Sequence, residues 1–123
     1  MGCGKIYLTN RTFEKAQKIK ETFNDISVQK WGDIPEFDIA INATSVGLNK
    51  ENFDLDLNKF GNNKFFYDVI YNPKETNFLK EANANGNKTE NGRMMFIYQA
   101  HQSFVLWNKV LPKIDEETIK ILK

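Results

Sequence analysis

The chain has 123 residues, of which 41% are hydrophobic and 27% charged, a composition typical of one soluble globular domain with its own core. A formal net charge of +1 implies no general electrostatic attraction to nucleic acid or membrane, and no apolar run approaches the roughly 20 residues that span a bilayer. The one cysteine, Cys3, excludes a disulfide framework or a multi-cysteine metal site, and without a signal-peptide core we expect a cytoplasmic chain.

The first part of the chain predicts a strand, a helix and a second strand. Residues 5–9 form a short run of β-branched and aromatic residues, which favours a strand. Apolar residues then recur at helical spacing over 13–23, with Thr12 as the N-cap and Glu14 favourably placed in the first turn. Residues 27–31 predict the second strand, and we expect a short helix between it and the third strand.

The remainder predicts further strands alternating with helices. Residues 38–42 and 65–70 are nearly all apolar, as in strands buried on both faces, and a polar loop at 43–50 follows the first of them. The later elements are predicted at 76–85, which Gly86 ends, and at 88–90, 92–110 and 116–122. This alternation predicts an α/β fold with a mainly parallel sheet flanked by helices.

Polar and cationic residues follow the predicted strands at their carboxyl ends, where parallel sheets bind ligands. They are Asn10, Arg11 and Thr12 after the first strand, Asn42, Ala43, Thr44 and Ser45 after the third, Tyr71 and Asn72 after the fourth, and Gly92 and Arg93 before the long helix. Such a gathering predicts a cleft for a polar, anionic small molecule. The residues alone leave open whether Arg11 holds a phosphate, as in NADP-binding folds, or is a surface arginine beside a helix cap.

Other polar residues have simpler explanations. Asp68 lies in a buried-type strand, where a structural hydrogen-bond acceptor is favoured over an active-site residue. Ser45 has no nearby base, and His101, the single histidine, lies within a predicted helix, so a Ser-His-Asp site is disfavoured. The cluster Met94-Met95-Phe96 favours core packing, whereas Gln99 follows Met95 by one helical turn and could reach the cleft.

Four stretches together resemble the C-terminal half of shikimate dehydrogenases, in the family's order and across nearly the whole chain. They are Asn10-Arg11-Thr12 with Lys15-Ala16, DIAINATSVGL (38–48), YDVIYNPKETNFLKEA (67–82) and NGRMMFIYQAHQSFVLW (91–107), with Pro112 following. The resemblance implies an NADP-dependent oxidoreductase of aromatic amino-acid biosynthesis that interconverts 3-dehydroshikimate and shikimate. It also implies that residues 1–123 are a partial NADP-binding domain with an incomplete Rossmann-like, doubly wound sheet.

The resemblance further implies roles for individual residues. For the cofactor these are Asn10, Arg11 and Thr12 at the adenosine 2′-phosphate, Asn42, Ala43, Thr44 and Ser45 in the loop beside it, Ile70 in the wall near the nicotinamide, and Gly92 and Met95 against the nicotinamide ring. For the substrate they are Tyr71 in the same wall and Gln99 as a hydrogen-bond partner of a hydroxyl group. No catalytic residue and no metal ligand is assigned, and Arg93 replaces an apolar residue usual in the family.

The family's Gly-rich turn, its first strand and helix, and its N-terminal substrate domain with the catalytic Lys and Asp have no counterpart in this sequence. We therefore expect unpaired inner strand edges, and hence rearranged pairing, strand-swapped self-association or marginal stability. We also expect no turnover of shikimate by the isolated chain. Two alternatives stay open: a non-catalytic remnant or nucleotide- or partner-binding module, and a quinate dehydrogenase relative, which Arg11 mildly disfavours.

Overall fold

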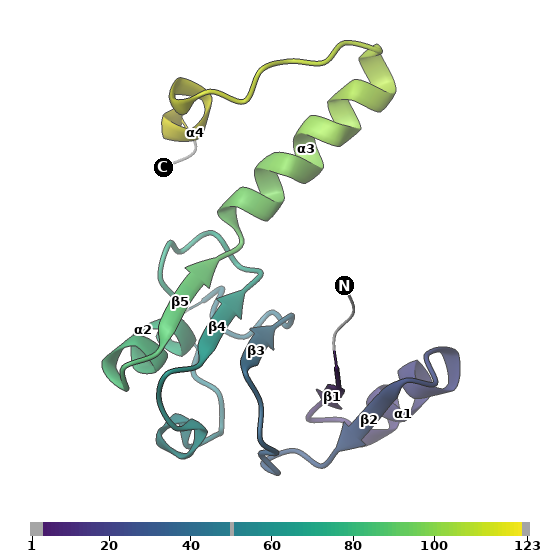
Figure 1. The fold of residues 1–123 in the computed structure, drawn as a ribbon, viewed down its shortest axis with the longest axis vertical. Coiled ribbons are helices and arrows are strands. Elements are labelled where there is room, and N and C mark those ends of the chain that lie inside the picture. The colour runs from purple at the N-terminus through teal and green to yellow at the C-terminus, as the bar shows by residue number, and fades with distance from the viewer. Residues whose placement is uncertain (1–3, 50, 122–123) are drawn as a thin grey trace. The chain divides into compact units, whose positions relative to one another are not determined.

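The computed structural model describes residues 4–49 and 51–121 (Figure 1). Cys3, Lys50 and Leu122 lie outside the described residues, so the predictions that touch them have no structural counterpart here. The chain divides into two compact units, unit 1 (Met1–Glu36) and unit 2 (Phe37–Lys123). Each unit is described by itself.

Unit 1 is a strand–helix–strand segment. Its elements are β1 (Ile6–Thr9), α1 (Phe13–Thr22) and β2 (Ile26–Gln29). The two strands pair in parallel, which the intervening helix makes possible as a crossover connection. The predicted first strand and helix are thereby confirmed.

The second strand of unit 1 lies earlier than the predicted residues 27–31. A turn begins at Lys30, whose carbonyl oxygen accepts from the backbone N–H of Asp33 at 3.1 Å. Gly32 supports that turn with a φ of +92°, a conformation that side-chain-bearing residues rarely adopt. Trp31 is therefore part of the turn rather than the strand.

Unit 2 contains a three-stranded parallel sheet. Its strands, in the order β3-β4-β5, are β3 (Ile39–Asn42), β4 (Phe65–Asp68) and β5 (Lys88–Asn91). All three point the same way, so their carboxyl ends form one edge (Figure 1). Strand β4 ends two residues before the predicted position because the carboxylate of Asp68 accepts from the backbone N–H of Ile70 and turns the chain.

The core of unit 2 lies on one face of this sheet, under α2 (Asn77–Ala84). Phe66 of β4 is only 1% exposed and packs against Phe78 of the helix with ring centroids 5.3 Å apart. The buried cluster comprises Leu57, Phe66, Phe78, Leu79 and Ala82. The hydroxyl group of Thr76 caps the helix by accepting from the N–H of Leu79, and Gly86, with φ at +77°, follows its end.

The expected short helix is present, but in a different place. Among the described residues it is the 3-10 helix η1 (Leu57–Phe60), between β3 and β4 rather than between β2 and β3. Asp56 begins it by accepting from the N–H of Asn58, and Leu57 anchors it in the core. The segment between β2 and β3 contains Gly32 and Pro35, both of which oppose helix formation.

Two further helices complete unit 2. They are α3 (Arg93–Asn108) and α4 (Glu116–Ile121). Helix α3 starts at the carboxyl edge of the sheet and projects from it, and it ends where Lys109 adopts a positive φ of 56° (Figure 1). None of the helices in the described part of the chain is long and apolar enough to cross a membrane.

The predicted α/β fold with parallel strands in a Rossmann-like arrangement is confirmed. A doubly wound sheet has the strand order 3-2-1-4-5-6. Without strand 1 this order leaves two strands on one side and three on the other, and the described strands form one sheet of two and one sheet of three. The described strands form two separate sheets, and rearranged pairing, self-association and marginal stability stay predictions.

One burial prediction is also wrong. Strand β3 was expected to be buried on both faces, yet Ile39 is 57% and Ile41 63% exposed. Ala40 and Asn42, which alternate with them, lie on the face that the core covers. The sequence pattern of β3 therefore fits a sheet with two covered faces, whereas the described residues cover one.

Candidate functional site

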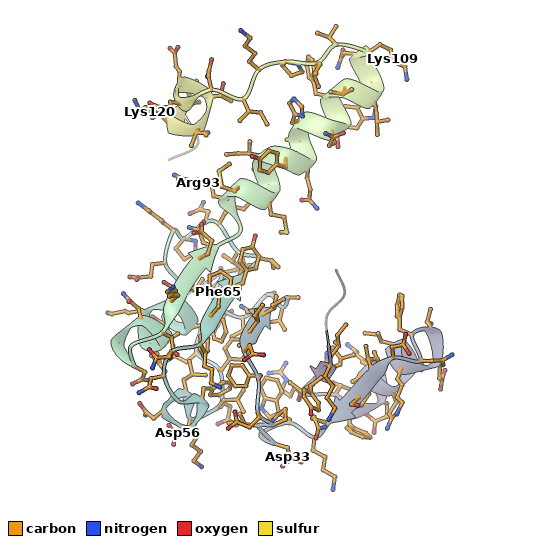
Figure 2. The ribbon with its side chains drawn as sticks, viewed as in Figure 1. Asp33, Asp56, Phe65, Arg93, Lys109 and Lys120 are labelled. Atoms are coloured by element: carbon orange, nitrogen blue, oxygen red, sulfur yellow. The ribbon has the colours of Figure 1, made fainter. Side chains whose placement is uncertain are left out.

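The carboxyl edge of the sheet in unit 2 gathers most of the predicted site residues. The register places Asn42, Asp68 and Asn91 side by side at the last position of their strands. The segments that follow these three residues therefore begin together, and the N–H of Gly92 donates to the carbonyl oxygen of Ile70 at 3.2 Å. Figure 2 marks the same edge by Arg93, the first residue of α3.

Asp68 is the centre of a buried hydrogen-bond network at this edge. Its side chain is fully buried and accepts from the Asn42 amide at 3.0 Å, the Ile70 N–H at 3.0 Å and the Thr76 hydroxyl at 2.6 Å. These bonds tie the ends of β3 and β4 to the start of α2. Asp68 is thus the structural acceptor that its place in the strand favoured, and a buried carboxylate needs such partners.

Asn42 uses its whole hydrogen-bonding capacity within the protein. Its amide nitrogen donates to Asp68 and to the carbonyl oxygen of Val46, and its oxygen accepts from the N–H and the hydroxyl of Thr44. An asparagine side chain offers two donor hydrogens and two lone pairs, so none is left for a ligand. Asn42 therefore shapes the loop, while Ala43 and Ser45 lie exposed on it.

A carboxylate closes the far side of this loop. Glu51 accepts from the backbone N–H groups of Asn49 and Gly47, both at 3.2 Å. These hydrogen bonds favour the charged form and hold the pKa of Glu51 below its ordinary value, Asn49 contributing most. Gly47 itself has a φ of +112°, so the turn that presents its N–H requires glycine.

Gly92 is required by a close approach of the backbone. A Cβ atom at this position would lie 2.0 Å from the carbonyl oxygen of Val69, a distance that no side chain can occupy. The sequence-based interpretation attributes Gly92 to a ring contact with a cofactor. The structure supplies a second and sufficient reason, which is the packing of β5 and the start of α3 against the segment after β4.

Aromatic packing fixes the predicted substrate wall. Tyr71 is 42% exposed and stacks on Phe96 of α3, with ring centroids 4.5 Å apart and planes 20° apart. Ile70 is buried beside it, and Met95 is partly buried at the start of α3. Gln99 is exposed one turn further along, so its amide is accessible.

The triplet Asn10, Arg11 and Thr12 lies in unit 1, between β1 and α1. The Asn10 side chain accepts from the N–H of Thr12 at 2.8 Å, which fixes the turn. Thr12 occupies the N-cap position as predicted, but its own side chain makes no capping hydrogen bond. Arg11 is exposed and, among the described residues, has no hydrogen-bond or ion-pair partner, so its guanidinium group is available.

Each unit also contains a cavity, and the one in unit 2 reaches the carboxyl edge at Asn91 and Arg93. One of about 380 Å³ in unit 2 is lined mainly by polar residues, Lys74, Glu75, Leu79, Thr89, Glu90, Asn91 and Arg93. One of about 440 Å³ in unit 1 is apolar and is lined by Ile6, Leu8, Ile19, Phe23, Asn24, Asp25 and Ile26. Within residues 4–49 and 51–121, no cluster of His, Cys, Asp and Glu could hold a metal ion.

Sequence reasoning assigned Phe96 to the core and gave Thr76 no part in the site. Phe96 supports the exposed ring of Tyr71, and Thr76 is both a helix cap and a partner of Asp68. The one sequence signal for the network was a charged residue in an otherwise apolar strand. Nothing in the sequence distinguished Phe96 from its apolar neighbours in the helix, because the sequence does not show which ring each of them contacts.

Comparison with known proteins points to one group of enzymes. The chain is 53% identical over 119 residues to the shikimate dehydrogenase (NADP(+)) of Pelagibacter ubique, and 41% identical over 132 residues to that of Caldicellulosiruptor saccharolyticus. These matches cover 96% and 100% of this chain but only 45% and 47% of those proteins, so the chain spans about half their length. No family model matches.

Solved structures give the same result. A shikimate dehydrogenase in complex with NADP+ superposes with a TM-score of 0.77 at 35% identity, covering 96% of this chain and 45% of that protein. A quinate dehydrogenase from Corynebacterium glutamicum in complex with NAD superposes with a TM-score of 0.83 at 26% identity, covering 98% and 46%.

Proposed function

Because the chain is homologous over nearly its whole length to the C-terminal portion of shikimate dehydrogenases, we propose that it is the cofactor-binding part of an NADP-dependent member of that family. The reaction interconverts 3-dehydroshikimate and shikimate in aromatic amino-acid biosynthesis, and NADP(H) exchanges the hydride. The observation that carries the proposal is 53% identity to an NADP(+) enzyme over 96% of this chain.

The residues of unit 1 suit the phosphate that distinguishes NADP from NAD. Arg11 is exposed and lies directly before the N-terminus of α1, whose free N–H groups attract anions. A planar guanidinium group binds a phosphate through paired hydrogen bonds. Asn10 holds the turn and Thr12 begins the helix, so the three residues form one polar site for the adenosine 2′-phosphate.

The residues of unit 2 suit the nicotinamide end of the cofactor. The Asp68 network holds the loop that presents Ala43, Thr44 and Ser45, while Asn42 acts through that loop. Gly92 places backbone, without a side chain, at the sheet edge. We assign Ile70 and Met95 to the cofactor side of the site.

Exposed polar side chains near the carboxyl edge of the same sheet supply the substrate contacts. The Tyr71 ring is held by Phe96 and stays partly exposed, and the exposed side chain of Gln99 is available to a substrate hydroxyl group. The resemblance to the family assigns no residue of this chain to the catalytic Lys or Asp. We therefore expect that proton transfer depends on the part of the enzyme that this chain does not span.

A quinate dehydrogenase acting with NAD is the second candidate, since one such enzyme has the TM-score of 0.83 given above. NAD-dependent enzymes favour an acidic residue where the ribose binds. Arg11 and the absence of an acidic residue before Glu14 argue for NADP instead.

A fusion protein tests the proposal. The part of the Pelagibacter ubique enzyme that this chain does not cover is joined to the N-terminus of this chain, and reduction of NADP+ and NAD+ is measured with shikimate and with quinate. We expect shikimate-dependent reduction of NADP+ by the fusion and none by the chain alone. Reduction of NAD+ with quinate would favour the second candidate.

A folded fusion that binds NADP+ without turnover would instead favour a non-catalytic nucleotide-binding module. Circular dichroism of the fusion and of the chain alone establishes that each is folded before activity is compared.

A further inference from the structure

The loop that follows β3 is held at two places. At its start, the buried Asn42 amide donates to the Asp68 carboxylate at 3.0 Å. At its far end, the Glu51 carboxylate accepts from the backbone N–H groups of Gly47 and Asn49, both at 3.2 Å, and from the Asn49 side-chain amide at 3.3 Å. We call this second set of contacts the Glu51 bridge. The loop is therefore fixed once from the core and once from its exposed side.

The Glu51 bridge acts on a glycine that touches the candidate site. Gly47 is buried, and a Cβ atom at this position would lie 3.1 Å from Cγ2 of Thr76 and 3.5 Å from Cδ1 of Ile70. Thr76 belongs to the Asp68 network, and Ile70 is the residue assigned above to the cofactor side of the site. The bridge therefore holds the backbone of Gly47 against two residues of the candidate site.

Ser45 is the residue that this arrangement presents to a ligand. It is exposed, and its backbone carbonyl oxygen accepts from the N–H of Leu48 at 3.2 Å. Its hydroxyl group forms no hydrogen bond with another residue in the described part of the chain. The Thr44 hydroxyl, in contrast, donates to Asn42 and accepts from the N–H of Val46. Of these two hydroxyl groups, that of Ser45 is therefore the one available to a cofactor.

The surroundings of Glu51 favour a role in loop geometry over a role in the core. Glu51 is exposed and lies outside the buried cluster of unit 2. Water competes for the hydrogen bonds of an exposed group, so their net contribution to stability is small. The same hydrogen bonds, above all that from the N–H of Asn49, lower the pKa of Glu51. The carboxylate is therefore charged at neutral pH, as suits converging backbone N–H groups.

We propose that Glu51 is a positioning residue of the cofactor site, whose bridge to Gly47 and Asn49 holds the loop so that Ser45 meets the nicotinamide end of the dinucleotide. The inference rests on the proposed function. Glu51 itself touches neither cofactor nor substrate. Because the nicotinamide end is identical in NADP and NAD, Glu51 affects the affinity for both, whereas Arg11 affects the affinity for NADP alone.

Substitutions in the fusion protein test the proposal. Glu51→Ala should lower the affinities for NADP+ and NAD+ by the same factor, about three- to tenfold, because binding must then order a loosened loop. Calorimetric titration measures both affinities. Glu81→Ala is the matched control, since Glu81 is an exposed glutamate of α2, and it should bind both cofactors as the unmodified fusion does. Unchanged affinities of Glu51→Ala, or a loss for NADP+ alone, overturn the proposal.

Two forms of rescue distinguish positioning from a general loss of structure. Glu51→Gln keeps an oxygen acceptor and should lose less affinity than Glu51→Ala. Formate carries a carboxylate that fits the N–H groups left free in Glu51→Ala, so it should restore affinity to that variant and leave the unmodified fusion unchanged. Sodium chloride at the same ionic strength is the control for salt. Rescue by either route supports the positioning role, and the absence of both overturns it.

Cofactor binding and turnover separate this inference from the proposed function. A folded fusion that binds neither NADP+ nor NAD+ contradicts both. A fusion that binds and turns over equally well with Glu51→Ala contradicts the inference alone. A fusion that binds cofactor without turnover, and loses affinity on Glu51→Ala, contradicts the dehydrogenase function and leaves the positioning role intact.

Discussion

The two units of this chain share the same alternation of strands and helices but differ in how much core each contains. Unit 1 pairs two strands with one helix, in which Ala16 is the buried residue. Unit 2 pairs three strands and has a core cluster of five buried residues, in which Phe66 of the sheet packs against α2. A two-stranded sheet is marginal in water, whereas three strands with a packed face can be stable.

The difference shows which part of the candidate site is held rigidly by this chain itself. The loop after β3 is fixed by the buried network around Asp68 and by Glu51. Arg11 sits on a turn supported by a single side-chain hydrogen bond from Thr12 to Asn10. We therefore expect unit 2 to be ordered on its own and unit 1 to depend more on additional contacts.

The largest expected effect comes from deleting the central ring of unit 2. Phe66→Ala should lower the free energy of unfolding by about 3–5 kcal/mol, because a fully buried ring is lost and a cavity remains. The matched control is Phe23→Ala in unit 1, where the ring is 61% exposed. It should change stability by no more than about 0.5 kcal/mol.

Urea unfolding and hydrogen exchange check this contrast. In the unmodified chain, the N–H groups of β1 and β2 should exchange faster than those of β4, and Phe66→Ala should remove protection in β4 and β5. Identical protection of both sheets, lost together in the variant, would show one cooperative unit and break the comparison.

The next effect concerns binding rather than stability. Arg11→Ala in the fusion protein should lower the affinity for NADP+ about ten- to hundredfold, because a charge-assisted contact contributes about 1.5–3 kcal/mol. Affinity for NAD+ should not change. Calorimetric titration measures both, with Lys20→Ala at the other end of α1 as the control. An equal loss for both cofactors would contradict a role at the 2′-phosphate.

A third prediction separates structure from cofactor contact at the edge of unit 2. Gly92→Ala should cost about 1–3 kcal/mol of stability, because the added methyl group meets the Val69 carbonyl oxygen at 2.0 Å. Gly4→Ala in unit 1 is the control, with no atom within 4 Å of the new carbon. Unchanged stability of Gly92→Ala in urea unfolding would mean that the backbones there do not approach so closely.

The smallest effect is a pH dependence in unit 2. Hydrogen bonds from Asn49 and Gly47 hold the pKa of Glu51 below its ordinary value of 4.5. Their stabilisation is therefore complete above pH 4.5 and disappears as the pH falls through the lowered pKa. The N–H resonances of Gly47 and Asn49 should titrate in that range, and Glu51→Gln should abolish the titration. A midpoint at or above 4.5 would disprove the loop closure.

The local elements followed from the sequence with small shifts. Residue type located β1 and apolar periodicity located α1, and α2 and α3 also lie where the sequence predicts them, because local patterns and propensities act over a few residues. The sequence misplaced the short helix because its position depends on Leu57, which is anchored in the core by a tertiary contact. The hydrogen bond to Asp56 that begins the helix is local. The end of β4 depended on one side chain, Asp68, turning back to its own backbone.

The candidate site divides in the same way. The sequence by itself determined which residues follow the strands, and therefore that Arg11, the 42–45 loop, Tyr71 and Gly92 occupy carboxyl ends. Only the tertiary structure decided that the Asn42 amide is fully used, that Gly92 meets Val69 and that Ile41 lies uncovered. The reason is physical: strand and helix periodicity are local, whereas hydrogen-bond saturation, close backbone approach and burial depend on residues distant in sequence.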